Sequence, residues 1–230
     1  MDNPALHLSF SQLALALVPV LMTLGILFKW SYDLGHAVYA LARMLAQLLL
    51  IGYVLAWIFG ASNGVLVLLV LAIMLLASSW IALGTVPEQR RALLWASVVS
   101  ITVGGGLTLA LITQAVLQID PWYLPNYMIP LAGMVFANAM TAVSLAAERL
   151  YAELAHGASW QSARLTAYQA AMIPVINSLF AVGLVSLPGM MTGQILSGVS
   201  PLVAARYQIV VMCMIFAASG ISTALFLAII

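Results

Sequence analysis

Long apolar stretches alternate with short polar breaks along the whole chain. A bilayer core about 30 Å thick is crossed by about 20 residues of apolar α-helix. On that scale the pattern predicts seven membrane-spanning helices, and only the fifth and sixth are separated by a long polar stretch. The seven helices are expected at 9–28, 37–59, 64–83, 94–118, 127–147, 172–197 and 203–229.

Composition indicates the same class of protein. Of the 230 residues, 65% are hydrophobic and 6% are charged, whereas soluble domains carry about 25% charged residues. We therefore predict an all-α, polytopic integral membrane protein with one transmembrane domain over 1–230, and exclude a soluble enzyme. Seven Lys and Arg residues nearly balance six Asp and Glu residues, so no nucleic-acid partner is expected. The single cysteine, Cys213, is expected to be a small buried apolar residue.

The basic residues between the spans predict the orientation. Lys29 lies in the first loop, Arg90 and Arg91 in the third, and Arg149 and Arg164 in the fifth, whereas the even-numbered loops and the N-terminal tail carry none. By the positive-inside rule, the odd-numbered loops face the cytoplasm. The expected location is the inner (cytoplasmic) membrane, with the N-terminus outside and the C-terminus in the cytoplasm. The N-terminal tail lacks the basic region of a cleaved signal peptide.

Two expected spans depart from plain lipid-facing helix. Arg43 and Gln47 stand one turn apart in the second span. An arginine there either extends to the cytoplasmic interface or lines a path or a subunit contact. The fourth span contains Gly104, Gly105 and Gly106, which favour close helix packing and permit a kink.

The polar stretch at about 148–170 is the only sizeable soluble surface, and we predict a helix–turn–helix. Gly157 is expected to end the first helix and Ser159 to cap a second, short one. The chain contains no GxxxxGK[ST] motif, so any energy from ATP must come from another subunit, which would dock here. A simple connector between two spans is the alternative. The residues expected to couple to an ATPase are Glu148, Arg149, Glu153, Gly157, Ala158, Ser159, Trp160 and Arg164.

Helix-breaking and polar residues inside the apolar segments mark a candidate substrate path. The sixth span contains SLPGMMTGQILSG at 186–198, where Pro188 and Gly189 are expected to break the helix and Gly193 to let it flex as a gate. Buried amides and hydroxyls need partners in hydrocarbon, so they line either helix interfaces or a water-filled cavity. The candidate path residues are Met190, Met191, Thr192, Gln194, Asn138, Met140 and Asn177.

Met190 and Met191 are also candidate metal contacts. Thioethers are soft, neutral ligands, and weak contacts suit a conducting path because a tight site does not release its ion. The alternative is that both fill gaps as apolar residues, as methionines commonly do. The spans contain no cluster of His, Cys and carboxylate residues with metal-ligand spacing.

Three stretches resemble the Fet-type ABC permease family: QLLLIGYVLAWIF at 47–59, YMIPLAGMVFANAMTAVSLAAERL at 127–150, and the segment 173–212. HGASW at 156–160 resembles the ATPase-facing loop of that family. Ala137 stands where the family usually has Gly, and the cytoplasmic stretch before Gly157 is short. The residues that match the signature or its flanks are Pro188, Gly189, Met190, Met191, Thr192, Gly193, Gln194, Asn177, Asn138, Met140, Arg206, Tyr207 and Gln208.

The resemblance implies a permease that exports iron, works as a homodimer among membrane lipids and pairs with two copies of a cytoplasmic ATPase. That partner would bind ATP and Mg²⁺, so this chain is expected to hold no cofactor and to catalyse no covalent chemistry. Bacterial members are associated with oxidative-stress resistance, and plant relatives with aluminium tolerance. An ATP-independent transporter or channel is the main alternative. It would need a carboxylate in mid-span, and the acidic residues all lie in loops or at span ends. A structural or receptor-like protein is a third possibility.

Overall fold

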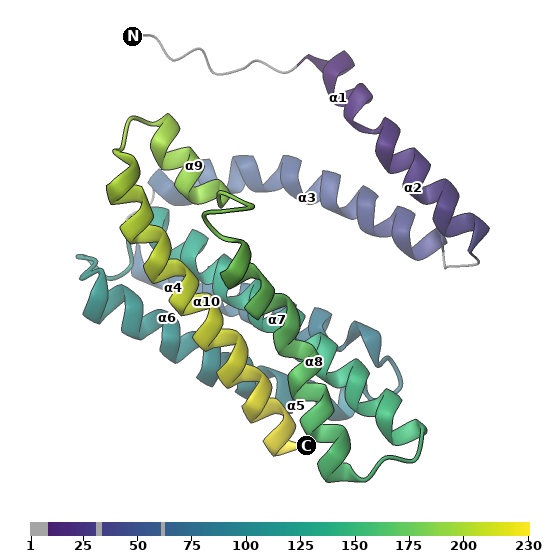
Figure 1. Cartoon of the computed structure of the whole chain (residues 1–230). Helices are drawn as coiled ribbons and strands as arrows, with labels where there is room; N and C mark the ends of the chain where they lie inside the picture. Colours follow the sequence, from purple (N-terminus) through teal and green to yellow (C-terminus); the bar gives the residue numbers. More distant parts are fainter. Residues whose placement is uncertain (1–8, 31–33, 61–62) are drawn as a thin grey trace. The chain divides into compact units, whose positions relative to one another are not determined.

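The computed structural model describes residues 9–30, 34–60 and 63–230 (Figure 1). The chain divides into two compact units, Met1–Gly60 and Ala61–Ile230. The regular elements of both units, over the described residues, are helices. This agrees with the prediction of an all-α membrane protein.

The first unit contains α1 (Phe10–Ala16), α2 (Val18–Lys29) and α3 (Leu34–Gly60). Ser9 begins α1 with a capping box, because its side chain accepts from the Gln12 amide while the Gln12 side chain accepts from the Ser9 amide. The predicted first span is helical but divided at Leu17, where Pro19 removes a backbone donor from the next turn. In α3, which contains the predicted second span, Arg43 is exposed.

The second unit begins with two helical segments that match the third and fourth predicted spans. Helix α4 (Gly64–Ala82) continues through a 3₁₀ turn, η1 (Leu83–Thr85). The fourth span is a chain of helical turns of different pitch: α5 (Arg90–Ile101), the π-helical turn η2 (Thr102–Gly106), α6 (Leu107–Leu111) and the π-helical turn η3 (Ile112–Val116).

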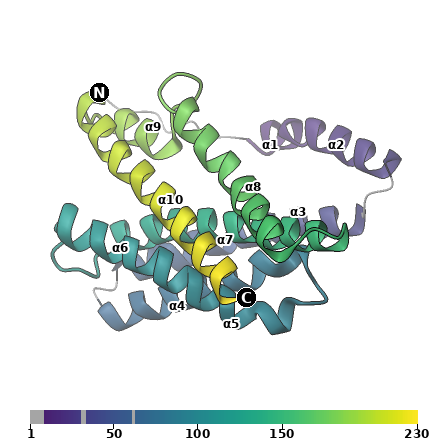
Figure 2. The ribbon, with the colours of Figure 1, turned by 60° about the horizontal axis from the view of Figure 1, so that its bottom comes forward.

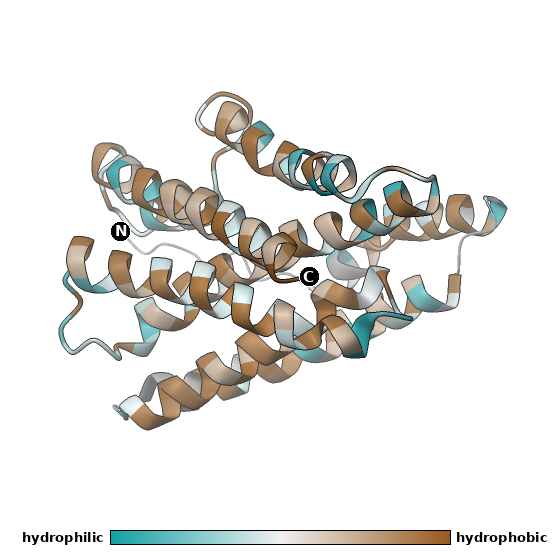
Figure 3. Cartoon of the chain, turned by 90° about the horizontal axis from the view of Figure 1, so that it is seen from below, coloured by the Kyte–Doolittle hydropathy of each residue, from teal (hydrophilic) through white to brown (hydrophobic). Residues whose placement is uncertain are grey.

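Four α-helices complete this unit: α7 (Pro125–Ala155), α8 (Trp160–Ala181), α9 (Gly189–Leu196) and α10 (Pro201–Ile229). Figure 2 shows α8 and α10 side by side, and both contact α7. Apolar residues run along the helices and hydrophilic residues gather mainly at their ends and turns (Figure 3).

Five helical segments are long and apolar enough to cross a membrane, and Ala14–Lys29 is a shorter apolar helix. The five are Leu34–Leu55, Gly64–Thr85, Arg90–Val116, Pro125–Ala155 and Pro201–Ile229. Helix α7, with 31 residues, is about 46 Å long and exceeds a bilayer core of about 30 Å. The prediction that the fifth span continues beyond the membrane surface is therefore consistent with its length.

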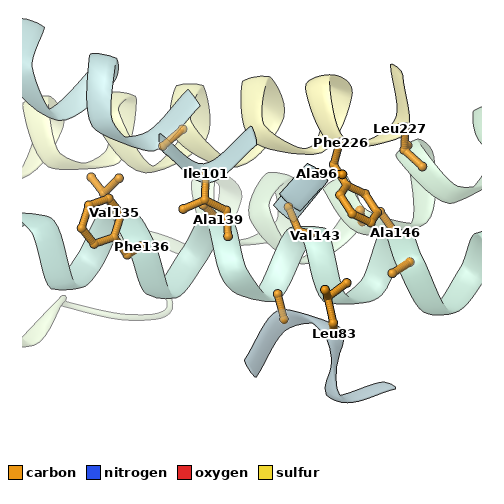
Figure 4. Packing of buried hydrophobic residues seen from close by; sticks show 14 of the residues in the cluster. Leu83, Ala96, Ile101, Val135, Phe136, Ala139, Val143, Ala146, Phe226 and Leu227 are labelled. Carbon is orange, nitrogen blue, oxygen red and sulfur yellow. The ribbon is translucent and has the colours of Figure 1, made fainter. Parts of the chain in front are cut away.

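The packing of α7 forms the centre of the second unit. Its buried residues recur every three or four positions, which is the spacing of one helix face. Many are alanines, so neighbouring helices approach closely. Figure 4 shows Val135, Phe136, Ala139 and Val143 of α7 facing Ile101 and other core residues.

Gly104 allows α10 to lie against η2. A Cβ atom at Gly104 would stand 2.8 Å from the Cα atom of Ser222 in α10, which is too close for any other residue. The π-helical turn shifts the hydrogen bonds of the backbone, and the Thr108 hydroxyl donates to the Gly104 carbonyl at 2.6 Å. The expectation of close packing is confirmed, and the backbone of the glycine run is π-helical rather than regular α-helix.

The predicted sixth span at 172–197 is wrong as a single helix. Helix α8 begins at Trp160, inside the predicted cytoplasmic stretch, so the helix that Ser159 caps is long rather than short. It ends at Ala181, and α9 starts only at Gly189. Because polar residues lie near the start of α8, hydropathy alone does not predict that the helix begins there and continues into the apolar segment.

The break between α8 and α9 depends on Gly183. Its φ of +84° lies in the left-handed region that favours glycine. The Ala181 carbonyl accepts from the Leu184, Val185 and Ser186 amides at 3.2, 2.8 and 3.1 Å. These bonds close a compact turn that stops the helix. Pro188 then stands at the N-cap of α9.

We expect Gly104→Ala to destabilise the second unit by about 1–3 kcal/mol, because the added methyl group meets the backbone of α10. Gly52→Ala in α3 is the matched control, since nothing lies within 4 Å of a Cβ there. Thermal unfolding in detergent micelles should give a lower midpoint for Gly104→Ala alone. Equal midpoints for the two variants would contradict the close approach.

We expect Gly183→Ala to cost about 1–2 kcal/mol through backbone strain, since the left-handed conformation disfavours a Cβ. Gly189→Ala serves as the control, because Gly189 is helical and has open space around it. The same unfolding measurement applies. A Gly183→Ala protein as stable as Gly189→Ala would show that Gly183 does not set the break.

Candidate functional site

Hydrogen bonds of the backbone and of Ser159 define the turn between α7 and α8. Gly157 has a φ of +83°, and its amide donates to the Leu154 carbonyl at 3.0 Å while the Ala158 amide donates to the Glu153 carbonyl at 3.1 Å. This is the Schellman pattern of a helix C-terminus. The Ser159 side chain accepts from the Ser162 amide at the start of α8. The predicted roles of Gly157 as a C-terminal cap and Ser159 as an N-cap are confirmed.

Charged side chains flank this turn on α7. Arg149 and Glu153 form an ion pair one helical turn apart, which is worth little by itself at a solvated surface. Glu148 is exposed. These residues give the end of α7 a polar surface.

A groove of about 360 Å³ lies beside the start of α8 and the last turns of α10. Trp160, Arg164, Leu165 and Leu227 are among the residues that line it. Trp160 is 42% exposed and Leu165 is 60% exposed. The predicted coupling residues Trp160 and Arg164 therefore share one surface, which is mainly apolar and carries one guanidinium group.

The segment around α9 separates the two candidate methionines. Met191 lines a cavity of about 280 Å³ between the end of α8, α9 and α10. Met190 packs instead against the hydrophobic core of the second unit. Thr192 donates to the Pro188 carbonyl at 3.2 Å. The buried Oε1 atom of Gln194 has no hydrogen-bond partner among the described residues.

Helix α9 is too short to cross a membrane by itself. Its eight residues span about 12 Å, less than half of a bilayer core. Gly193 lies inside this helix rather than at its end. Gly198, with a φ of +92°, ends it, and the Val199 amide donates to the Gln194 carbonyl at 3.0 Å. The positions at which the chain changes direction are thus Gly183 and Gly198.

The polar candidates on α7 and α8 lie elsewhere. The Asn138 side chain donates to the Met134 carbonyl at 2.8 Å and lines a cavity of about 70 Å³ between α7 and α8. Met140 packs against the core, and Asn177 is exposed. Asn138 and Met191 thus line two different cavities. A common path through all of the candidates remains a prediction.

The sequence pattern did not predict that residues of α10 near α9 belong to the path. Gln208, Met212 and Cys213 line the same cavity as Met191. Cys213 is exposed, so the expectation that it is buried is wrong, because it lies on the open side of α10 rather than in the core. The spacing of Gln208 and Met212, four residues apart on one helix, is the signal that places them together.

Comparison with known proteins gives a family for this chain. Residues 10–230 match the family described as "Uncharacterised protein family (UPF0014)". The Synechocystis protein named "UPF0014 membrane protein slr1647" is 36% identical over 204 residues, covering 82% of this chain and 79% of the relative. No solved structure matches.

Two further relatives carry more specific names. The Escherichia coli "Probable iron export permease protein FetB" is 33% identical over 94% of this chain and 88% of its own length. The Arabidopsis thaliana "Protein ALUMINUM SENSITIVE 3" is 34% identical over 91% and 81%. With a helical architecture that suits a membrane and relatives that match over most of their length, this chain belongs to the UPF0014 family.

Proposed function

We propose that this permease is the membrane subunit of an ATP-driven exporter of metal cations. It would work as a homodimer with two copies of a separate cytoplasmic ATPase that binds ATP and Mg²⁺, and would itself catalyse no covalent reaction. The observation that carries this proposal is the exposed apolar surface at the start of α8, beside the rigid turn between α7 and α8.

The composition of that surface suits a protein partner. Trp160 and Leu165 expose apolar area beside Arg164, and tryptophan and arginine are the residues that contribute most to protein interfaces. A helix–turn–helix held by a Schellman motif presents them at a fixed position. The basic residues of the odd-numbered loops support a cytoplasmic position for this turn.

Helix α8 offers a direct mechanical connection from the docking surface to the candidate path. It runs without interruption from Trp160 to Ala181, over 22 residues, which is about 33 Å. Its first turn lines the docking groove, and its last turn lines the cavity that contains Met191. A push by the ATPase on Trp160 would therefore move one wall of that cavity.

The nature of the cargo rests on a relative and on the polar candidates. The Escherichia coli relative is named a probable iron export permease, which supports a metal cation and iron in particular. We assign the path to Met190, Met191, Thr192, Gln194, Asn138, Met140 and Asn177, with Pro188, Gly189 and Gly193 around the break as the gate.

An ATP-independent cation transporter or channel is the second candidate. Coupling to protons or sodium calls for a carboxylate within the membrane. Among the described residues, Glu88 and Asp120 lie in connections between helices, and Glu148 and Glu153 lie in the last two turns of α7. Their positions favour the ATP-driven mechanism.

Co-purification tests the docking surface. We expect the wild-type chain to retain a cytoplasmic ATPase, and the double variant Trp160→Ala, Arg164→Ala to weaken the complex by about 30-fold or more, since two central interface anchors are lost. Trp95→Ala is the matched control, because Trp95 is 73% exposed on α5 and is not part of the groove.

Loss of the complex in the Trp95 variant to the same extent, or transport by the purified chain without any ATPase, would contradict the proposal. Size-exclusion chromatography of each variant checks that the chain is folded.

A further inference from the structure

Three sulfur-bearing side chains line one cavity at the junction of α8, α9 and α10. Met191 comes from α9, and Met212 and Cys213 come from α10. The cavity has a volume of about 280 Å³, enough to admit an ion with part of its ligand shell. Most of the remaining wall is apolar, so the sulfur atoms are prominent among the few groups able to bind a ligand there.

A buried amide in the same wall lacks a partner. Gln208 is 5% exposed, lines the cavity, and its Oε1 atom accepts no hydrogen bond from the described part of the chain. A buried carbonyl without a partner costs about 1–3 kcal/mol. The oxygen has almost no accessible surface, so it lies behind the wall of the cavity, and the sulfur atoms are the ligands that the wall itself offers.

The electrostatics of the cavity also favour a cation. Val182, the C-cap of α8, and Gly183 form part of the wall. The C-terminal end of a helix carries a partial negative charge of about half an elementary charge. No carboxylate is among the lining residues, so the one group there that can become a full anion is the Cys213 thiol.

These ligands select a class of cation. We propose, building on the proposed role in cation export, that this cavity binds one soft monovalent cation of the copper(I) class through the Cys213 thiolate and the Met191 and Met212 thioethers. The thiol transfers its proton to solvent as its sulfur binds the cation. The charges +1 and −1 then cancel, which minimises the cost of holding an ion in a low-dielectric site.

Iron(II) fits this particular cavity less well. One thiolate leaves a divalent ion with a net charge of +1, and neutral thioethers compensate none of it. Thiolate and thioether ligands prefer copper(I) to harder ions. The chemistry of the chain itself therefore points to a softer, monovalent cargo for this cavity.

Silver(I) retention by the purified full chain tests the proposal, with silver(I) as a redox-inert substitute for copper(I). Excess N-acetylcysteine is added as a competitor, because a lone surface thiol holds silver no better than the free competitor does. We expect the wild type to retain one silver ion per chain, and Met191→Leu and Met212→Leu each to lower the retention affinity at least about tenfold, since each removes a ligand. Cys213→Ser should abolish retention.

Met214→Leu is the matched control, because it makes the same change two residues from Met212 on α10, at a side chain that is buried in the core and is not among the residues lining the cavity. It should retain silver as the wild type does. Leucine keeps the volume and apolarity of methionine, and monodisperse elution confirms that each variant is folded. Binding to the wild type should also release one proton per silver ion and resist an excess of iron(II).

Complete removal of silver from the wild type by N-acetylcysteine would overturn the proposal, as would equal losses in the Met214 and Met191 variants or displacement by iron(II). Silver binding by the isolated chain requires no ATPase. Failed binding with an intact ATPase complex therefore contradicts this site alone, whereas intact binding without a complex contradicts only the docking surface.

Discussion

The close packing of neighbouring helices around α7 is the interaction on which the second unit depends. Lipid tails are as apolar as leucine, so burial of apolar area does little to drive helices together inside a bilayer. Association depends instead on small residues that allow backbones to approach. The buried alanines of α7 and the contact of Gly104 with Ser222 provide this, and they fix α8 and α10 against the same central helix.

That arrangement also fixes the position of α8 in the second unit. Helix α8 contacts both α7 and α10, and its buried residues extend from Ala163 to Val175. One of its ends presents Trp160 and Arg164, and the other reaches the cavity beside α9. The turn at Gly183 then releases the chain from the helix and allows the short α9 to place Met191 and Met190 in different surroundings. The proposed docking surface and the proposed cargo site thus lie at the two ends of one helix.

Local chemistry made part of this architecture predictable from the sequence. Hydropathy located the helices whose apolar runs exceed the length of a bilayer, and Gly157 and Ser159 marked a turn because their preferences act within a few residues. Gly183 was not predicted as the residue that ends the helix because it stands in the apolar run AVGLVSL. In such a run the sequence does not distinguish a glycine within a helix from a glycine in a left-handed turn. The sequence pattern instead predicted the break at Pro188, which lies at the α9 end of this turn.

Side-chain surroundings were the least predictable feature. In a membrane protein both the buried and the lipid-facing sides of a helix are apolar, so composition does not separate them. For this reason the sequence pattern predicts the same role for Met190 and Met191 and a buried position for Cys213. Tertiary packing instead separates the two methionines and leaves the cysteine exposed. The grouping of Met191 with Gln208 and Met212 depends on how α9 folds back on α10.

Transport in inside-out membrane vesicles tests the central claim of ATP-driven cation export most directly. Vesicles containing the permease and its ATPase should accumulate the metal cation, supplied as iron(II) or as silver(I), only when ATP and Mg²⁺ are present outside. An ATPase variant unable to hydrolyse ATP should give no accumulation. Uptake at the same rate without ATP, driven by a proton or sodium gradient, would contradict the account.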